Sequence, residues 1–209
     1  MLKHIVIWLV ITTISLVLSP LIFDADQFKK KYSEDRTALA NSIGEESASY
    51  IFNKTEEIYR GLFVESGFQP WFFKTYQIGE REPVTGLEEP DQQDKFRDYA
   101  DTYVITFFIS MYEMIYRLTQ LTYWAAFSLP FVIAAAFDGL MQRKIRILTF
   151  KYSSPVTYNT MWHFLIALTS GTVIYCNTPF AMPVIAYPFL VFLFAMALRT
   201  LISNLQRSA

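Results

Sequence analysis

The stretch LTQLTYWAAFSLPFVIAAAF (residues 118–137) contains no charged side chain and is followed at once by DGLMQRKIR (residues 138–146). A helix needs roughly 20 mostly apolar residues to cross the hydrocarbon core of a bilayer, and this stretch supplies them. Pro130 removes one backbone hydrogen bond, which neighbouring helices can tolerate. The stretch therefore predicts a membrane-spanning helix that ends in a basic cluster.

Three further apolar blocks predict three further crossings, at Ile5–Phe23, Tyr158–Cys176 and Pro183–Ile202. The first block could also be a cleaved signal peptide. Its length, and the lack of a small-x-small cleavage site after it, favour an uncleaved signal anchor over residues 1–23. The sequence thus predicts an all-α membrane protein with four transmembrane helices, and a helical periplasmic domain between the first and second.

The second crossing is predicted to continue a longer helix. A helical pattern begins near Gln92, so residues 102–137 are expected to form one helix that enters the membrane. Glu113 and Arg117 are four residues apart on this helix and are expected to pair. The last two crossings are predicted to form a hairpin over residues 158–202, with a tail at 203–209.

Residues 24–101 contain seventeen acidic and ten basic residues, a net charge of −7, whereas the rest of the chain has a net charge of +6. Helical spacing over much of this segment predicts an acidic helical periplasmic domain. The cluster at 71–73 (Trp-Phe-Phe) is interpreted as part of its core or as a belt on the membrane surface, the core being favoured. Residues 78–94 are rich in Glu, Pro and Gly, which predicts a mobile loop.

The basic residues set the expected orientation. Residues 138–157 are predicted to be a short loop, and short loops rich in Lys and Arg stay in the cytoplasm. Four crossings then place both termini in the cytoplasm of a bacterium whose inner membrane holds the chain. Lys29, Lys30 and Lys31 argue against this orientation, but they lie in a long segment, and long segments can translocate regardless of charge.

The sequence has no recognisable catalytic constellation. It contains no phosphate-binding glycine loop and no nucleophile elbow. His4 and His163 are expected to be interfacial polar tips, and the single cysteine, Cys176, supports neither a disulfide nor a zinc cluster. We therefore expect no enzyme activity, no cofactor, no metal and no direct binding of nucleic acid.

The basic loop has two interpretations. It determines topology by resting on anionic headgroups, or it also forms a docking surface for a cytoplasmic protein. The candidate partner-binding residues are Asp138, Arg143, Lys144, Arg146 and Lys151.

Three stretches resemble a family of bacterial inner-membrane proteins encoded in conjugative transfer regions, on integrating conjugative elements and conjugative plasmids. They are DGLMQRKIRILTFKYSSPVTYNTMWH at 138–163, GEESASYIFNKTEEIYRGLFVESG at 44–67, and the tail at 197–206. The family contains a domain of unknown function and is similar to plasmid TraJ-type membrane proteins. The first helix and the acidic loop match it only in character.

The resemblance implies an accessory or scaffold protein of type IV secretion, with the coupling ATPase as the suspected partner and Arg143, Lys144 and Arg146 as contacts. A homo-oligomer is compatible with it. Two alternatives remain. One is a small transporter or channel subunit with Glu113 and Arg117 lining a path, and the other is an immunity protein acting through its outer domain.

Overall fold

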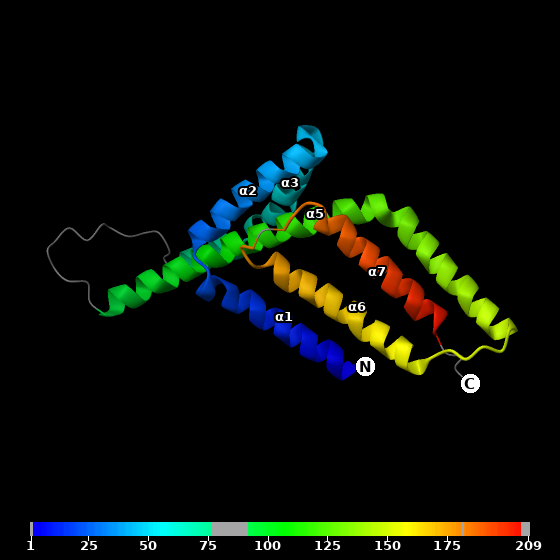
Figure 1. Cartoon of the computed structure of the whole chain (residues 1–209). Helices are drawn as coiled ribbons and strands as arrows, with labels where there is room; N and C mark the ends of the chain where they lie inside the picture. Colours follow the sequence, from blue (N-terminus) through cyan, green and yellow to red (C-terminus); the bar gives the residue numbers. More distant parts are fainter. Residues whose placement is uncertain (1, 77–91, 181, 206–209) are drawn as a thin grey trace. The chain divides into compact units, whose positions relative to one another are not determined.

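The computed structural model describes residues 2–76, 92–180 and 182–205, and all regular structure in these ranges is helical. The elements are α1 (Leu2–Ile22), α2 (Ala25–Ile43), α3 (Glu45–Tyr59), a π-helix (Arg60–Val64), α4 (Phe68–Tyr76), α5 (Gln92–Leu148), α6 (Pro155–Cys176) and α7 (Ala186–Ser203) (Figure 1). The all-α prediction is confirmed for these residues. The loop predicted at residues 78–94 lies almost wholly outside them.

The chain forms two compact units, which are described separately. The acidic unit consists of Leu16–Thr119 and Cys176–Ala181, and the span unit consists of Met1–Ser15, Gln120–Tyr175 and Met182–Ala209. The second therefore combines the first turns of α1 with the C-terminal part of α5, most of α6 and all of α7.

In the acidic unit, α2 and α3 form a hairpin that turns at Gly44. Gly44 has a φ of 85°, which side chains with a Cβ rarely adopt, and its N–H donates to the carbonyl of Ala40 to close α2. Phe28 and Leu39 of α2 and Ile51 of α3 are fully buried. Burial of these side chains holds the hairpin in the unit, because each buried large apolar side chain contributes about 1.5–3 kcal/mol.

Aromatic rings join this hairpin to the first half of α5. Tyr32 of α2 lies edge-on to Tyr112 and Tyr116 of α5, with ring centroids 5.4 and 5.1 Å apart, and Phe52 of α3 stacks on Tyr116 at 5.6 Å. Edge-to-face and stacked ring pairs at such distances are favourable beyond the area they bury. The helical domain predicted in the acidic segment therefore also includes the first half of α5, on which α2 and α3 pack.

The aromatic cluster at residues 71–73 lies on α4, and its members differ in their surroundings. Phe72 and Phe73 pack on Phe108 of α5, with centroids 6.1 and 5.5 Å away. Trp71 is 58% exposed. The favoured interpretation as core is thus supported for the two phenylalanines and not for the tryptophan.

Helix α5 has 57 residues and, at 1.5 Å per residue, is about 85 Å long. Only part of such a helix fits within the roughly 30 Å hydrocarbon layer. The expected helical start near Gln92 is confirmed, and Pro130 lies inside the helix without ending it. The prediction of a loop over residues 138–157 is wrong for its first half, because α5 continues to Leu148. Lys, Arg, Leu and Met are good helix formers, so a basic cluster does not end a helix.

Three described helices are long and apolar enough to cross a membrane, not the four predicted. They are α1 from His4 to Ile22, α5 from Asp98 to Leu148, and α7. Helix α6 exists with close to the predicted bounds but does not meet that apolarity. Its 22 residues include many polar side chains, namely Thr157, Asn159, Thr160, His163, Thr169, Ser170 and Thr172. The expectation that both termini are cytoplasmic depended on this fourth crossing.

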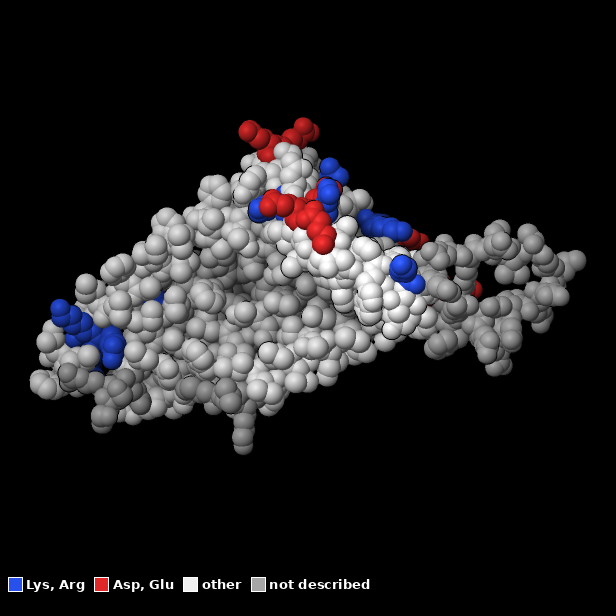
Figure 2. Space-filling view, turned by 180° about the vertical axis from the view of Figure 1, so that it is seen from behind, with Lys and Arg blue, Asp and Glu red and all other residues white. Residues whose placement is uncertain are grey.

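In the span unit, α6 packs on α7 around Leu165, Ala197 and Leu201, with Met161 and Trp162 against them. Helix α5 contacts α7 through stacked rings of Phe131 and Phe192, whose centroids are 5.5 Å apart. In Figure 2 the visible charged side chains of the acidic unit are of both signs, whereas in the span unit a group of Lys and Arg gathers at the C-terminal end of α5.

Candidate functional site

The basic end of α5 is attached to the end of α7 by three of the five predicted site residues. Asp138 forms an ion pair with Nε of Arg199. Next to it, Gly139 lies so close to α7 that a Cβ there would stand 2.7 Å from the carbonyl oxygen of Arg199. The pairing and the close approach occur in the same turn, so α5 and α7 are fixed side by side at this point.

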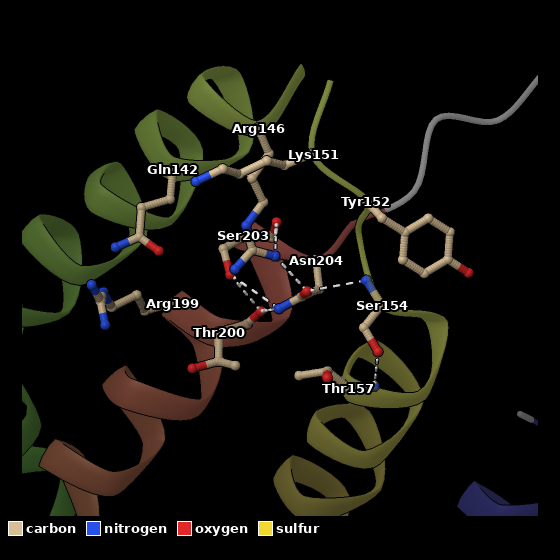
Figure 3. A pocket seen from close by; sticks show the side chains of 10 residues that line it. All are labelled: Gln142, Arg146, Lys151, Tyr152, Ser154, Thr157, Arg199, Thr200, Ser203 and Asn204. Carbon is tan, nitrogen blue, oxygen red and sulfur yellow. Dashed lines mark hydrogen bonds between the residues drawn. The ribbon is translucent and has the colours of Figure 1, made fainter. Parts of the chain in front are cut away.

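One turn further on, two arginines bind the C-terminal end of α7. Nε of Arg143 donates to the carbonyl of Leu205 at 3.2 Å. Nη1 of Arg146 donates to Oδ1 of Asn204 at 2.5 Å and to the carbonyl of Ser203 at 3.3 Å (Figure 3). The last carbonyls of a helix have no partner within the helix, and basic side chains satisfy them well. Arg143 and Arg146 therefore act here as C-caps of α7.

Lys144 and Lys151, the other two predicted residues, are exposed. Around them the link between α5 and α6 presents large apolar side chains to solvent, with Phe150 97% and Tyr152 81% exposed. Phe150 has a φ of 53°, an uncommon conformation for a residue with a Cβ. The backbone N–H of Lys151 donates to the carbonyl of Arg146 at 2.9 Å and closes this turn. Of the five residues, Asp138, Arg143 and Arg146 therefore bind α7, and Lys144 and Lys151 are exposed.

A pocket of about 530 Å³ opens between the end of α5, the link and the ends of α6 and α7. Figure 3 shows the ten side chains that line it: Gln142, Arg146, Lys151, Tyr152, Ser154, Thr157, Arg199, Thr200, Ser203 and Asn204. Three of these are cations, and none of them is an Asp or Glu. The lining can therefore donate many hydrogen bonds to an anion.

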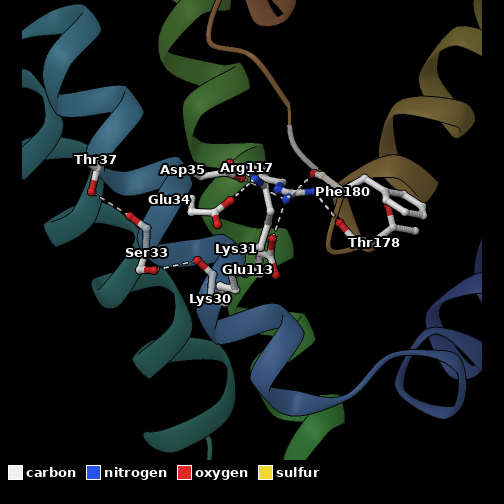
Figure 4. Close-up of polar contacts among 10 residues, drawn as sticks. All are labelled: Lys30, Lys31, Ser33, Glu34, Asp35, Thr37, Glu113, Arg117, Thr178 and Phe180. Carbon is white, nitrogen blue, oxygen red and sulfur yellow. Dashed lines mark hydrogen bonds and ion pairs between the residues drawn. The ribbon is translucent and has the colours of Figure 1, made fainter.

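In the acidic unit, the pair expected between Glu113 and Arg117 is present, and it is larger than expected. Nη2 of Arg117 donates to Oε1 of Glu113 at 2.5 Å and to Oδ2 of Asp35 on α2 at 3.0 Å (Figure 4). The same guanidinium donates to the carbonyls of Thr178 at 2.6 Å and Phe180 at 2.9 Å. Arg117 is 0% exposed. One buried arginine therefore joins α2, α5 and the segment that follows α6.

Lys31 of α2 adds a second cation at the edge of this cluster. Its Nζ lies 2.6 Å from Glu34 and 3.7 Å from Asp35. The hydrogen bond to Glu34 raises the pKa of Lys31. Burial raises the pKa of Asp35, although the charges of Arg117 and Lys31 oppose that shift. The cluster is a set of charges that compensate one another inside the unit, with two carboxylates around one guanidinium.

Asp35 and Asn204 are central to these contacts, and neither role was predicted from the sequence. Asp35 is 82 residues from Arg117 and Asn204 is 58 residues from Arg146. Only the local i,i+4 spacing of Glu113 and Arg117 could be recognised without the fold. A signal that could have revealed Asp35 is its place beside Leu39 on the buried side of α2.

The described residues contain no group of three or more His, Cys, Asp or Glu side chains placed to hold a metal ion. His4 and His163, which are far apart in the sequence, are in contact within the span unit, with ring centroids 4.6 Å apart. Two imidazoles are fewer ligands than a structural metal site uses. Cys176 is a free, buried cysteine.

Comparison with known proteins gives one match. No curated protein and no solved structure matches the chain. A family model described as "IncC plasmid conjugative DNA transfer protein DtrJ-like" matches residues 30–208, which is well over half of the sequence and includes both the cluster around Arg117 and the basic end of α5. The chain therefore belongs to the DtrJ-like family and is involved in conjugative DNA transfer.

Proposed function

We propose that the protein is a non-enzymatic accessory of the type IV secretion apparatus, held in the bacterial inner membrane, that docks a cytoplasmic protein at the basic end of α5. The coupling ATPase is the partner that the resemblance suggests. The observation that carries the proposal is that the side chains at this end of the helix have two different environments. Asp138, Arg143 and Arg146 bind α7, while Lys144, Phe150 and Tyr152 project from it.

This arrangement has the features of a protein-binding surface. Binding energy at interfaces concentrates in a few large side chains, and aromatic residues are enriched among them. An exposed ring costs less to bury in a partner if its backbone is already ordered. The link carrying Phe150 is ordered in this way, because Thr149 N–H and Lys151 N–H donate to the carbonyls of Ile145 and Arg146.

The charge of this surface also fits the proposed topology. Lys and Arg near the end of a span stay on the cytoplasmic side. The acidic unit would then lie on the periplasmic side, where residues 24–101 were predicted. In this arrangement α5, which begins at Gln92 and ends at Leu148, would cross the membrane.

The test is a pair of double variants in a mating assay. Lys144→Glu combined with Phe150→Asn changes the charge and one aromatic side chain of the proposed docking surface and leaves the residues that bind α7 unchanged. Asn tolerates the backbone conformation at position 150. We expect transfer frequency to fall by about tenfold or more, since losing one anchor ring and one charge weakens binding by at least about 1.4 kcal/mol.

The matched control is Lys74→Glu combined with Tyr50→Asn, which changes one exposed lysine and one exposed aromatic residue of the acidic unit. It should transfer normally. Both variants must reach the membrane at wild-type levels. Normal transfer by the Lys144 and Phe150 variant would refute the docking role, and crosslinking from position 144 in mating cells would identify the partner.

A further inference from the structure

The pocket at the basic end of α5 has a lining suited to a particular kind of ligand, and it lies beside the protein-docking surface, with which it shares Tyr152. Arg146 of α5, Lys151 of the link and Arg199 of α7 line it (Figure 3). Ser154, Thr157 and Thr200 also line it, and their side chains carry hydroxyl groups; that of Thr200 donates to the carbonyl of Met196. Cations together with hydroxyl donors are the groups that bind phosphate oxygens.

The acceptor groups around the pocket are already engaged in hydrogen bonds. The carboxylate of Asp138 accepts from Nε of Arg199 and from Nε2 of Gln142, so the charge of Arg199 is partly compensated. The carbonyl of Ser203 accepts from Arg146, and the carbonyl of Thr200 accepts from Nδ2 of Asn204 at 2.9 Å. Oδ1 of Asn204 accepts from Arg146 and from the backbone N–H of Ser154 at 3.4 Å. Asn204 is 4% exposed, so it is a fixed part of the wall. The bonds of Arg146 leave from Nη1, and a guanidinium has five N–H donors to share.

The first turn of α6 adds a favourable dipole. The backbone N–H of Thr157 donates to Oγ of Ser154 at 3.2 Å, which caps the helix, and Pro155 occupies its first position. Ser154 and Thr157 both line the pocket. The positive end of this 22-residue helix therefore faces the same space as the three cations.

The surroundings of the pocket favour a lipid as the source of the anion. Arg146, Arg199 and Ser203 lie in the last turns of α5 and α7, two of the helices long and apolar enough to cross a membrane. Residues adjacent in sequence to the lining are apolar and exposed, with Leu148 at 69% and Val156 at 73%. A volume of about 530 Å³ is within the range of small-ligand sites, roughly 300–1,000 Å³.

We infer that this pocket binds the phosphate group of an anionic phospholipid, with the acyl chains against the exposed apolar side chains next to it. Basic pockets between helices at the cytoplasmic side of a membrane commonly take such headgroups. A lipid in this position would lie between α5, α6 and α7. It would therefore stabilise the arrangement of the three helix ends on which the docking surface rests.

The test measures lipid binding by the purified full chain in detergent micelles, using thermal unfolding and native mass spectrometry. Phosphatidylglycerol should raise the unfolding midpoint, because a ligand of the folded state stabilises it. Diacylglycerol, which lacks the phosphate, should not. Glycerol phosphate at the same concentration should have no effect if a lipid is the ligand. If it gives the same rise as phosphatidylglycerol, the proposed lipid source is wrong and the ligand is a soluble phosphate.

Two variants localise the binding. Lys151→Gln removes the charge of an exposed lining residue and should weaken phosphatidylglycerol binding about fivefold. Thr200→Glu places a carboxylate in the lining and should abolish binding. The matched control is Lys144→Gln, which removes the same charge seven residues earlier, outside the lining, and should change binding less than twofold.

Two results would overturn the inference. Equal losses from Lys144→Gln and Lys151→Gln would show that binding reflects general surface charge. Tighter binding of a short single-stranded DNA than of phosphatidylglycerol, with the same loss in Lys151→Gln, would assign the pocket to nucleic acid. Neither outcome bears on docking, which is tested by transfer of the Lys144 and Phe150 variant.

Discussion

Arg117 joins several parts of the acidic unit, although burying its charge is unfavourable in free energy. It is fully buried and is surrounded by Glu113, Asp35 and two backbone carbonyls. Taking these charges out of water is expensive, and the expense is offset only while every partner is present. Removing the cation alone leaves two carboxylates buried beside each other.

We therefore expect Arg117→Gln to lower the free energy of unfolding of the acidic unit by about 3–5 kcal/mol. Urea titration of the full chain in micelles, followed by circular dichroism, measures this. The matched control is Arg60→Gln, whose ion pair with Glu65 at 3.8 Å is exposed and should be worth less than about 1 kcal/mol. A triple variant that also carries Glu113→Gln and Asp35→Asn should recover part of the loss. Equal effects of Arg117→Gln and Arg60→Gln would contradict this account.

At the scale of residues, the pairing of residues close together in the sequence was predicted, and contacts between residues far apart in the sequence were not. The i,i+4 spacing of Glu113 and Arg117 was sufficient to predict their pairing. Asp35 joins them only because the hairpin of α2 and α3 packs on α5 through Tyr32 and Phe52. The predicted role of Arg143 and Arg146 as partner contacts remains untested, and the structure shows each of them bonded to the end of α7.

At the scale of elements, apolar runs and helical spacing were sufficient to predict most helices, including the start of α5. Two features could not be predicted. The π-helix at Arg60–Val64 has no distinguishing composition, and the continuation of α5 past Phe137 was hidden by charges that were interpreted as a loop. Charge reports on which side of a membrane a segment lies, and it does not report where a helix ends.

The contact between α5 and α7 gives the prediction at this scale. Gly139→Ala would bring a methyl group to 2.7 Å from the Arg199 carbonyl and 3.1 Å from Cβ of Ile202, so one helix must move. We expect a loss of about 1–3 kcal/mol in the free energy of unfolding, as in other overpacked sites. The control is Gly171→Ala in α6, where a Cβ meets nothing within 4 Å. There the gain in helix propensity should stabilise by about 0.5–1 kcal/mol. Thermal unfolding in micelles compares the two, and similar midpoints would argue against the close contact.

At the scale of the whole molecule, the asymmetry of charge was evident from the sequence, and the number of crossings was not. An uncharged block was counted as a span even though α6 is rich in Thr, Ser and Asn. Hydropathy reflects the free energy of transferring a segment from water to lipid. Helix α6 lies between α1 and α7, so less of its surface would contact lipid. Orientation is therefore better tested directly than inferred from the count.

Cysteine accessibility provides that test, because Cys176 is the only cysteine in the chain. In a Cys176→Ala background, Asn53→Cys on α3 and Lys144→Cys on α5 both replace exposed residues. If the acidic unit is periplasmic and the basic end of α5 cytoplasmic, a membrane-impermeant maleimide should label position 53 in intact spheroplasts. Position 144 should react only after lysis. Each variant should first be shown to support transfer. Labelling of position 144 in intact spheroplasts would reverse the orientation and remove the docking surface from the reach of a cytoplasmic ATPase.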